Sequence, residues 1–162
     1  CYRLNPAMKL WVDVEEFGHC FAAAQKMAAT APVAGAIPEY LNAESLYLGE
    51  LLVEDRYEEW VLPYRQELQS NYLHILEQLC QHFFAQEEFL ALDSFSRKLL
   101  AIEPCHELAH RRLMRAYCRR HHAHLALRQY HLCCQAMARE LDAEPEEETH
   151  QLYEKIRQQL PV

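Results

Sequence analysis

Histidine and cysteine gather between residues 105 and 134, and both residue types bind metals or carry nucleophilic chemistry. His106 and His110 are four residues apart, so they would share one face of a helix, and two such imidazoles can hold a metal together. No zinc-finger or C-x-x-C spacing accompanies them, and His110 falls at an interior position of a helical pattern. The sequence therefore favours structural histidines and predicts no metal site and no cofactor.

A catalytic nucleophile would have to be Cys133 or Cys134, with His131 as its base. His131 would have to reach around its own helix, and no acidic residue lies nearby to orient it. The three glycines are too scattered to form a phosphate-binding loop. We therefore expect no enzymatic activity.

Arginines provide the strongest candidate binding surface. Arg111, Arg115 and Arg119 recur every four residues and so share one helical face. Guanidinium groups suit carboxylates and phosphates, and the face predicts a groove for an acidic peptide. The residues assigned to this groove are His74, Glu77, Gln81, Phe84, Arg111, Arg115 and Arg119. The alternative is a solvated basic face, or one paired with segment 140–154, which holds seven acids and no base.

An aromatic cluster precedes the groove and has two interpretations. Its members are Tyr57, Trp60, Tyr64 and Tyr72. They could form an exposed binding platform, but their helical spacing favours a buried core, with Trp60 as its anchor.

Composition limits the fold and the partners. The chain has 162 residues, of which 51% are apolar and only 3 are glycine, which favours helices over a β-sandwich or barrel. A formal net charge of −8 makes general binding to nucleic acid unfavourable. No apolar run reaches the length of a membrane span, and the seven cysteines without a signal-peptide pattern predict free thiols in the cytoplasm.

The first half of the chain predicts an extended segment followed by three helices. Residues 1–12 look extended, and Asp13 fits the start of a helix. A loop at 29–38 and a short helix at about 40–48 follow, and Gly49 fits the residue after that helix. A long helix then covers about 55–84, and Pro63 either starts the main part of this helix or, in the favoured interpretation, kinks it.

The second half repeats itself with a period of 34 residues, which is the tetratricopeptide spacing of paired antiparallel helices. Apolar residues from Leu76 to Pro104 set the pattern, and residues from His110 to Ala138 repeat it. His121 stands where glycine is usual. After a turn at Asp142–Pro145, a last amphipathic helix caps the stack. We expect an all-α, tetratricopeptide-like superhelix of about eight helices with a short extended N-terminal remnant.

Four segments, taken in order, resemble a known family. They are YRLNP…WVDVEEF, LYLGELLVEDRYEEWVLPYRQEL, LLAIEPCHELAHRRLMRAY and LALRQYHLCCQAMARELDAEPEEETHQLYEKI. Together they resemble the bacterial transcriptional activator domain of antibiotic-regulatory-type regulators. The resemblance implies that residues 1–12 are the end of a winged-helix DNA-binding domain, that 13–162 form the activator domain, and that the chain is a fragment of a longer protein.

The resemblance also implies a regulator that acts through protein contacts. The implied partners are other domains of the same regulator, RNA polymerase or a second copy of the chain, and DNA is bound only through the N-terminal domain. Two alternatives stay open. One is a sensing domain that binds a small anionic effector at Arg111 and Arg115, and the other is a passive scaffold between the DNA-binding domain and later domains.

Overall fold

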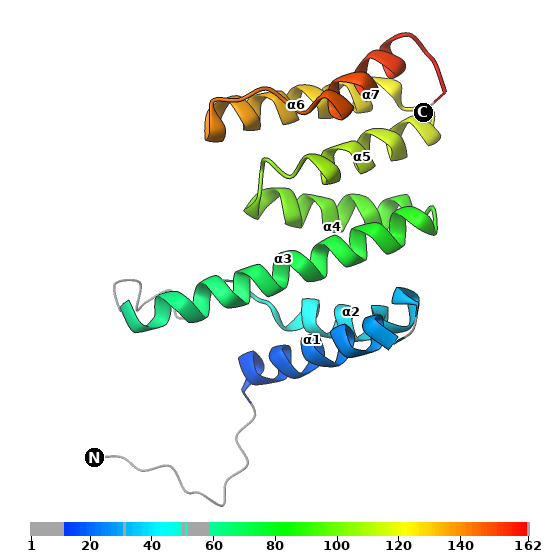
Figure 1. The fold of residues 1–162 in the computed structure, drawn as a ribbon. Helices are drawn as coiled ribbons and strands as arrows, with labels where there is room; N and C mark the ends of the chain where they lie inside the picture. Colours follow the sequence, from blue (N-terminus) through cyan, green and yellow to red (C-terminus); the bar gives the residue numbers. More distant parts are fainter. Residues whose placement is uncertain (1–11, 31, 50, 52–58, 162) are drawn as a thin grey trace, which may run out of the picture. The chain divides into compact units, whose positions relative to one another are not determined.

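A computed structural model gives the structure of the chain and describes residues 12–30, 32–49, 51 and 59–161. Within these residues the chain forms seven α-helices and two short 3-10 helices and contains no strand, so the predicted all-α class is confirmed. The chain divides into two compact units, Cys1–Ile75 and Leu76–Val162, which are described one at a time (Figure 1). Apart from Val12, the extended segment predicted at 1–12 lies outside the described residues.

The first unit begins with α1 (Asp13–Thr30), η1 (Val33–Ala36) and α2 (Ile37–Leu46). Phe17 and Phe21 are one turn apart on α1, and their rings stack with centroids 6.5 Å apart. Both are buried, as is Tyr40 of α2. Apolar side chains one turn apart on α1 therefore lie where α1 packs against α2.

The end of α2 differs from the prediction. The helix ends at Leu46, so Gly49 is not the residue that follows it. Tyr47 closes the helix by donating its N–H to the carbonyl of Glu44, and its ring stacks on Tyr72 at 3.8 Å. Gly49 has a φ of 142°, a backbone conformation that a side chain would strain, so the loop still requires a glycine there.

Two predictions about the start of the long helix are wrong. After η3 (Glu59–Val61), α3 runs over Leu62–Ala85, so Pro63 lies in its first turn, where its missing N–H costs nothing, and does not kink it. Trp60 and Tyr64 are 63% and 59% exposed, because the inward position of this turn is taken by Arg65, whose Nε donates to the Leu51 carbonyl at 2.6 Å. Tyr72 is buried as predicted, and Tyr57 lies outside the described residues.

The second unit contains the Leu76–Ala85 part of α3 and four further helices (Figure 1). These are α4 (Phe89–Ile102), α5 (Glu107–Arg119), α6 (Ala123–Leu141) and α7 (Glu147–Arg157). One apolar cluster joins α5, α6 and α7, formed by Leu113, Met114, Tyr117, Ala126, Tyr130, Leu152 and Ile156. The capping role predicted for the last helix is confirmed, since α7 buries its apolar face in this cluster.

The backbone repeats the 34-residue period at the turn inside each helix pair. α3 ends at Ala85 and α5 at Arg119, and the turns that follow hold Glu87 and His121 at φ values of 58° and 61°. The N–H of Glu88 donates to the Phe83 carbonyl at 2.9 Å, and the N–H of His122 donates to the Tyr117 carbonyl at 2.8 Å. His121 therefore adopts the left-handed conformation that glycine usually supplies.

Candidate functional site in the second unit

Arg111 lies under α7 and is not open to solvent. Only 7% of it is exposed, and its guanidinium donates to Glu146 Oε2 and to Thr149 Oγ1, each at 2.8 Å. Glu148 lies 3.5 Å from the same guanidinium. The pairing with the acidic segment that the sequence left open as an alternative is therefore present for this arginine.

Glu107 completes the contact between α5 and α7. Its buried carboxylate accepts the backbone N–H of Glu146 at 3.0 Å and the hydroxyl of Thr149. Glu146 is the N-cap residue of α7, so an acid from α5 satisfies the start of that helix. Glu107 and Arg111 are one turn apart on α5, and together they hold the first turn of α7.

The remaining groove residues of the second unit keep polar groups at the surface. Arg115 lies 3.3 Å from Glu148, and its side chain is 30% exposed. Arg119 pairs with Glu87 at 3.0 Å, and its guanidinium lies 5.0 Å from the centre of the Phe84 ring. Gln81 is exposed on α3.

Glu77 binds the start of α5. Its carboxylate accepts a hydrogen bond from Nε2 of His106, whose Nδ1 accepts the N–H of Ala109 at 3.2 Å. His106 is thus the N-cap residue of α5. The imidazole proton is therefore on Nε2, because Nδ1 must accept.

His74 belongs to the first unit and packs there. Its ring lies 5.7 Å from that of Phe21 and 6.2 Å from that of Tyr40. The sequence assigned His74 to the groove from its spacing along α3, whereas its ring contacts lie with α1 and α2.

The metal and nucleophile candidates are explained by packing. Burial raises the pKa of the Cys133 thiol to about 12, which disfavours the reactive thiolate. Nε2 of His110 donates to the Pro104 carbonyl at 3.0 Å, and Nδ1 accepts from the Gln129 amide at 2.8 Å. In the part of the chain that the structure describes, no three His, Cys, Asp or Glu residues are grouped so that they could hold a metal ion.

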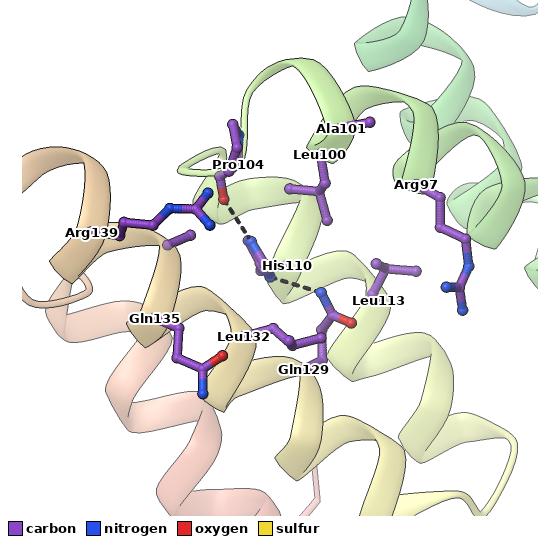
Figure 2. A pocket seen from close by; sticks show the side chains of 11 residues that line it. Arg97, Leu100, Ala101, Pro104, His110, Leu113, Gln129, Leu132, Gln135 and Arg139 are labelled. Carbon is purple, nitrogen blue, oxygen red and sulfur yellow. Dashed lines mark hydrogen bonds between the residues drawn. The ribbon is translucent and has the colours of Figure 1, made fainter.

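A pocket of about 440 Å³ opens between α4, α5 and α6, and sequence reasoning did not find it (Figure 2). His110 and Gln129 line it beside apolar side chains from α4 and α6. The sequence held one signal for this pocket. Positions 34 residues earlier are Leu76 and Phe95, so a polar pair replaces an apolar pair at equivalent positions of the repeat.

Comparison with protein-family models shows to which family the chain belongs. The model of the bacterial transcriptional activator domain matches residues 12–157. The chain belongs to this family. Comparisons with curated proteins and with solved structures found no match. The activator-domain family explains the order of the four sequence segments and assigns the chain a role in bacterial transcription regulation. No helix among the described residues is long and apolar enough to cross a membrane.

Proposed function

We propose that this activator domain is the protein-interaction module of a cytoplasmic bacterial regulator, without catalytic activity of its own. The binding surface is the repeat groove, defined as Glu77, Gln81 and Phe84 of α3 with Arg115 and Arg119 of α5. The observation that supports it most directly is that groove residues of α3 contact both ends of α5, through Glu77 with His106 and through Phe84 with Arg119. Helical repeats commonly use concave faces to bind extended segments.

The partner is an acidic peptide segment from another domain of the regulator or from RNA polymerase. Arg115 and Arg119 keep side chains that are 30% and 41% exposed, so a carboxylate can reach both. Their present partners, Glu148 and Glu87, are exposed acids, and such surface pairs stabilise by only about 0–1 kcal/mol. An incoming acidic segment can therefore exchange with them at little cost.

The test uses the full-length regulator and a reporter gene under its control. Arg115→Glu and Gln81→Glu each place a negative charge in the repeat groove, and both should lower activation while operator binding stays unchanged. Gln81 is exposed, so its variant reports on charge without disturbing the contact of Arg115 with α7. Arg128→Glu is the matched control, because Arg128 is exposed on α6 outside the groove.

Unchanged activation by both groove variants would refute the groove and favour a passive scaffold between the DNA-binding domain and later domains. The other alternative, an anionic effector held by Arg111 and Arg115, has less support. The pocket beside Arg115 measures about 100 Å³, whereas ligand pockets usually measure about 300–1,000 Å³. Arg111 is already occupied by carboxylates of α7.

Self-association is a further part of this proposal, because DNA half-sites occur in pairs and dimeric regulators match that symmetry. Sedimentation of the chain at micromolar concentration measures it directly. A monomer at every concentration tested would remove self-association from the proposal and would leave the groove to be judged by the reporter experiment.

A further inference from the structure

The pocket between α4, α5 and α6 is large enough for a small molecule. Its volume of about 440 Å³ falls within the usual range of ligand sites, about 300–1,000 Å³. Leu100 of α4, Leu113 of α5 and Leu132 of α6 supply apolar walls, and Figure 2 shows them around His110. This pocket is separate from the repeat groove, since none of its lining residues belongs to that groove.

The polar pair in this pocket is not a requirement of the repeat fold. His110 is 3% exposed and Gln129 is 8% exposed, and burying such groups costs free energy unless they are hydrogen-bonded. The equivalent residues of the preceding helix pair, Leu76 and Phe95, form the same architecture with apolar side chains. At these two positions the second pair therefore carries buried polar side chains where the first pair has apolar ones.

The hydrogen bonds of this pair leave one acceptor for a ligand. The His110 ring uses both nitrogens, one toward Pro104 and one toward the amide nitrogen of Gln129 (Figure 2). Among the described residues, no hydrogen bond uses the amide oxygen of Gln129. This oxygen can therefore accept a bond from a hydroxyl or N–H group of a bound molecule.

The charge of the pocket is opposite to that of the chain. Arg97 and Arg139 line its two ends, and none of the described residues that line it is acidic (Figure 2). The chain as a whole carries a formal charge of −8, so a pocket whose charged side chains are both basic is a local exception. Each arginine contacts an exposed or half-exposed acid outside the lining, at 2.6 Å for Arg97 with Asp93 and 2.8 Å for Arg139 with Glu140.

We propose that this pocket binds a small organic anion with an apolar body, such as an aromatic or medium-chain carboxylate that carries a hydroxyl group. The leucine side chains cover the body, the amide oxygen of Gln129 accepts a hydrogen bond from the hydroxyl, and an arginine at the end of the pocket binds the carboxylate. The proposal does not depend on the repeat groove. It gives the activator domain a site at which a metabolite could change its stability or its contacts.

Calorimetric titration of the 162-residue chain with four probes tests the ligand class. Naphthoate should bind, hydroxynaphthoate should bind more tightly, and acetate should not bind, because it lacks the apolar body. Methyl naphthoate, the neutral ester of naphthoate without a hydroxyl or N–H donor, should bind about three- to fivefold more weakly, the effect of one partly exposed ion pair. Absence of naphthoate binding, or equal binding of naphthoate and methyl naphthoate, would overturn the proposal.

Variants at the mouth of the pocket test its location. Leu132 is 44% exposed, so Leu132→Glu should fold normally, and its carboxylate should weaken naphthoate binding at least about tenfold by repulsion and lost apolar contact. Leu90→Glu is the matched control, since Leu90 is 77% exposed on α4 and does not line the pocket. Arg139→Gln should weaken binding about three- to fivefold, and Arg128→Gln should not change it.

Naphthoate binding that survives Leu132→Glu would place the probe elsewhere and overturn the proposal. Sedimentation of the same variants identifies a different occupant. If Leu132→Glu converts a dimer to a monomer while Leu90→Glu does not, a second copy of the chain covers the pocket, and the small-molecule assignment is wrong.

Discussion

The Leu76–Ala85 part of α3 with α4 forms one helix pair, and α5 with α6 forms another. Both pairs make the same turn with different side chains. Glu87 and His121 adopt nearly the same positive φ, and the backbone hydrogen bonds around them repeat at a spacing of 34 residues. Neither residue is a glycine, so backbone hydrogen bonding fixes this turn against a local preference.

The side chains of the two pairs diverge wherever they leave the shared core. Glu77 of the first pair corresponds to Arg111 of the second, and Leu76 with Phe95 corresponds to His110 with Gln129. The first pair has apolar side chains at Leu76 and Phe95, a buried contact between Cys80 and Ser96, and polar groups at its surface. The second pair contains a buried ionic contact with α7 and a polar pocket floor. One backbone thus supports two chemistries, and each proposed site takes residues from both pairs.

The largest expected difference between the pairs concerns Glu77 and Arg111. Arg111→Ala should lower the free energy of unfolding by about 3–5 kcal/mol, because it leaves the buried carboxylate of Glu107 without its cation. Glu77→Ala at the equivalent position should cost only about 1 kcal/mol, since its side chain is 41% exposed. Urea unfolding of both variants measures the difference, and equal losses would mean that the α5–α7 contact is not a buried ionic one.

The next largest effect on the free energy of unfolding is expected at the hydrogen-bonded pair of His110 and Gln129. Gln129→Leu should cost about 1–3 kcal/mol, because Nδ1 of His110 loses its donor. The double variant His110→Leu with Gln129→Phe gives the second pair the side chains that the first pair has at these positions. Its free energy of unfolding should return to within about 1 kcal/mol of that of the original chain. The double variant should also lose naphthoate binding. A double variant less stable than Gln129→Leu alone would show that the polar pair is structural.

The same histidine predicts a dependence of stability on pH. Burial lowers the pKa of His110 below its usual value of 6.5, so the folded state binds this proton less readily than the unfolded state. Its contribution is fully present above about pH 6.5 and is lost as the pH falls toward the lowered pKa, with a slope of at most about 1.4 kcal/mol per pH unit. Unfolding at about pH 7 and about pH 5 should show a smaller loss for the double variant than for the original chain, and identical losses would contradict the assignment.

The smallest expected effect tests the shared turn. His121→Gly should raise the free energy of unfolding by about 0.5–1 kcal/mol, because glycine adopts a φ of 61° without strain. Glu87→Gly should gain less, since it also removes the contact of Glu87 with Arg119. Thermal unfolding of the two variants compares them, and a loss of stability in His121→Gly would mean that its side chain supports the turn.

The predictions that the structure confirmed were based on the periodic spacing of apolar residues. The 34-residue repeat, the capping helix and the burial of Tyr72 all follow from apolar spacing, which is a local property of the chain. Trp60 was predicted to be core from the same kind of spacing and is exposed. A spacing of four residues means one helical face only where the helix already runs, and α3 begins two residues after Trp60.

The candidate site was predictable in part. The sequence placed Arg111, Arg115 and Arg119 on one face and named the acidic segment as an alternative partner. It could not tell which arginine would be covered, because that depends on where α7 packs. The pocket was not predicted because its walls come from three helices. The replacement of an apolar pair by His110 and Gln129 indicates a pocket only once the structure shows that both side chains line the same space.

The sequence by itself determined the helices, their repeat and the family, because these depend on residues close together in the chain. The tertiary structure decided which charges are buried and which remain available to a partner. Burial depends on contacts between residues more than thirty positions apart, such as Arg111 with Glu146 and Glu107 with Thr149. Such contacts form only when α5 and α7 have packed, and no local pattern specifies them.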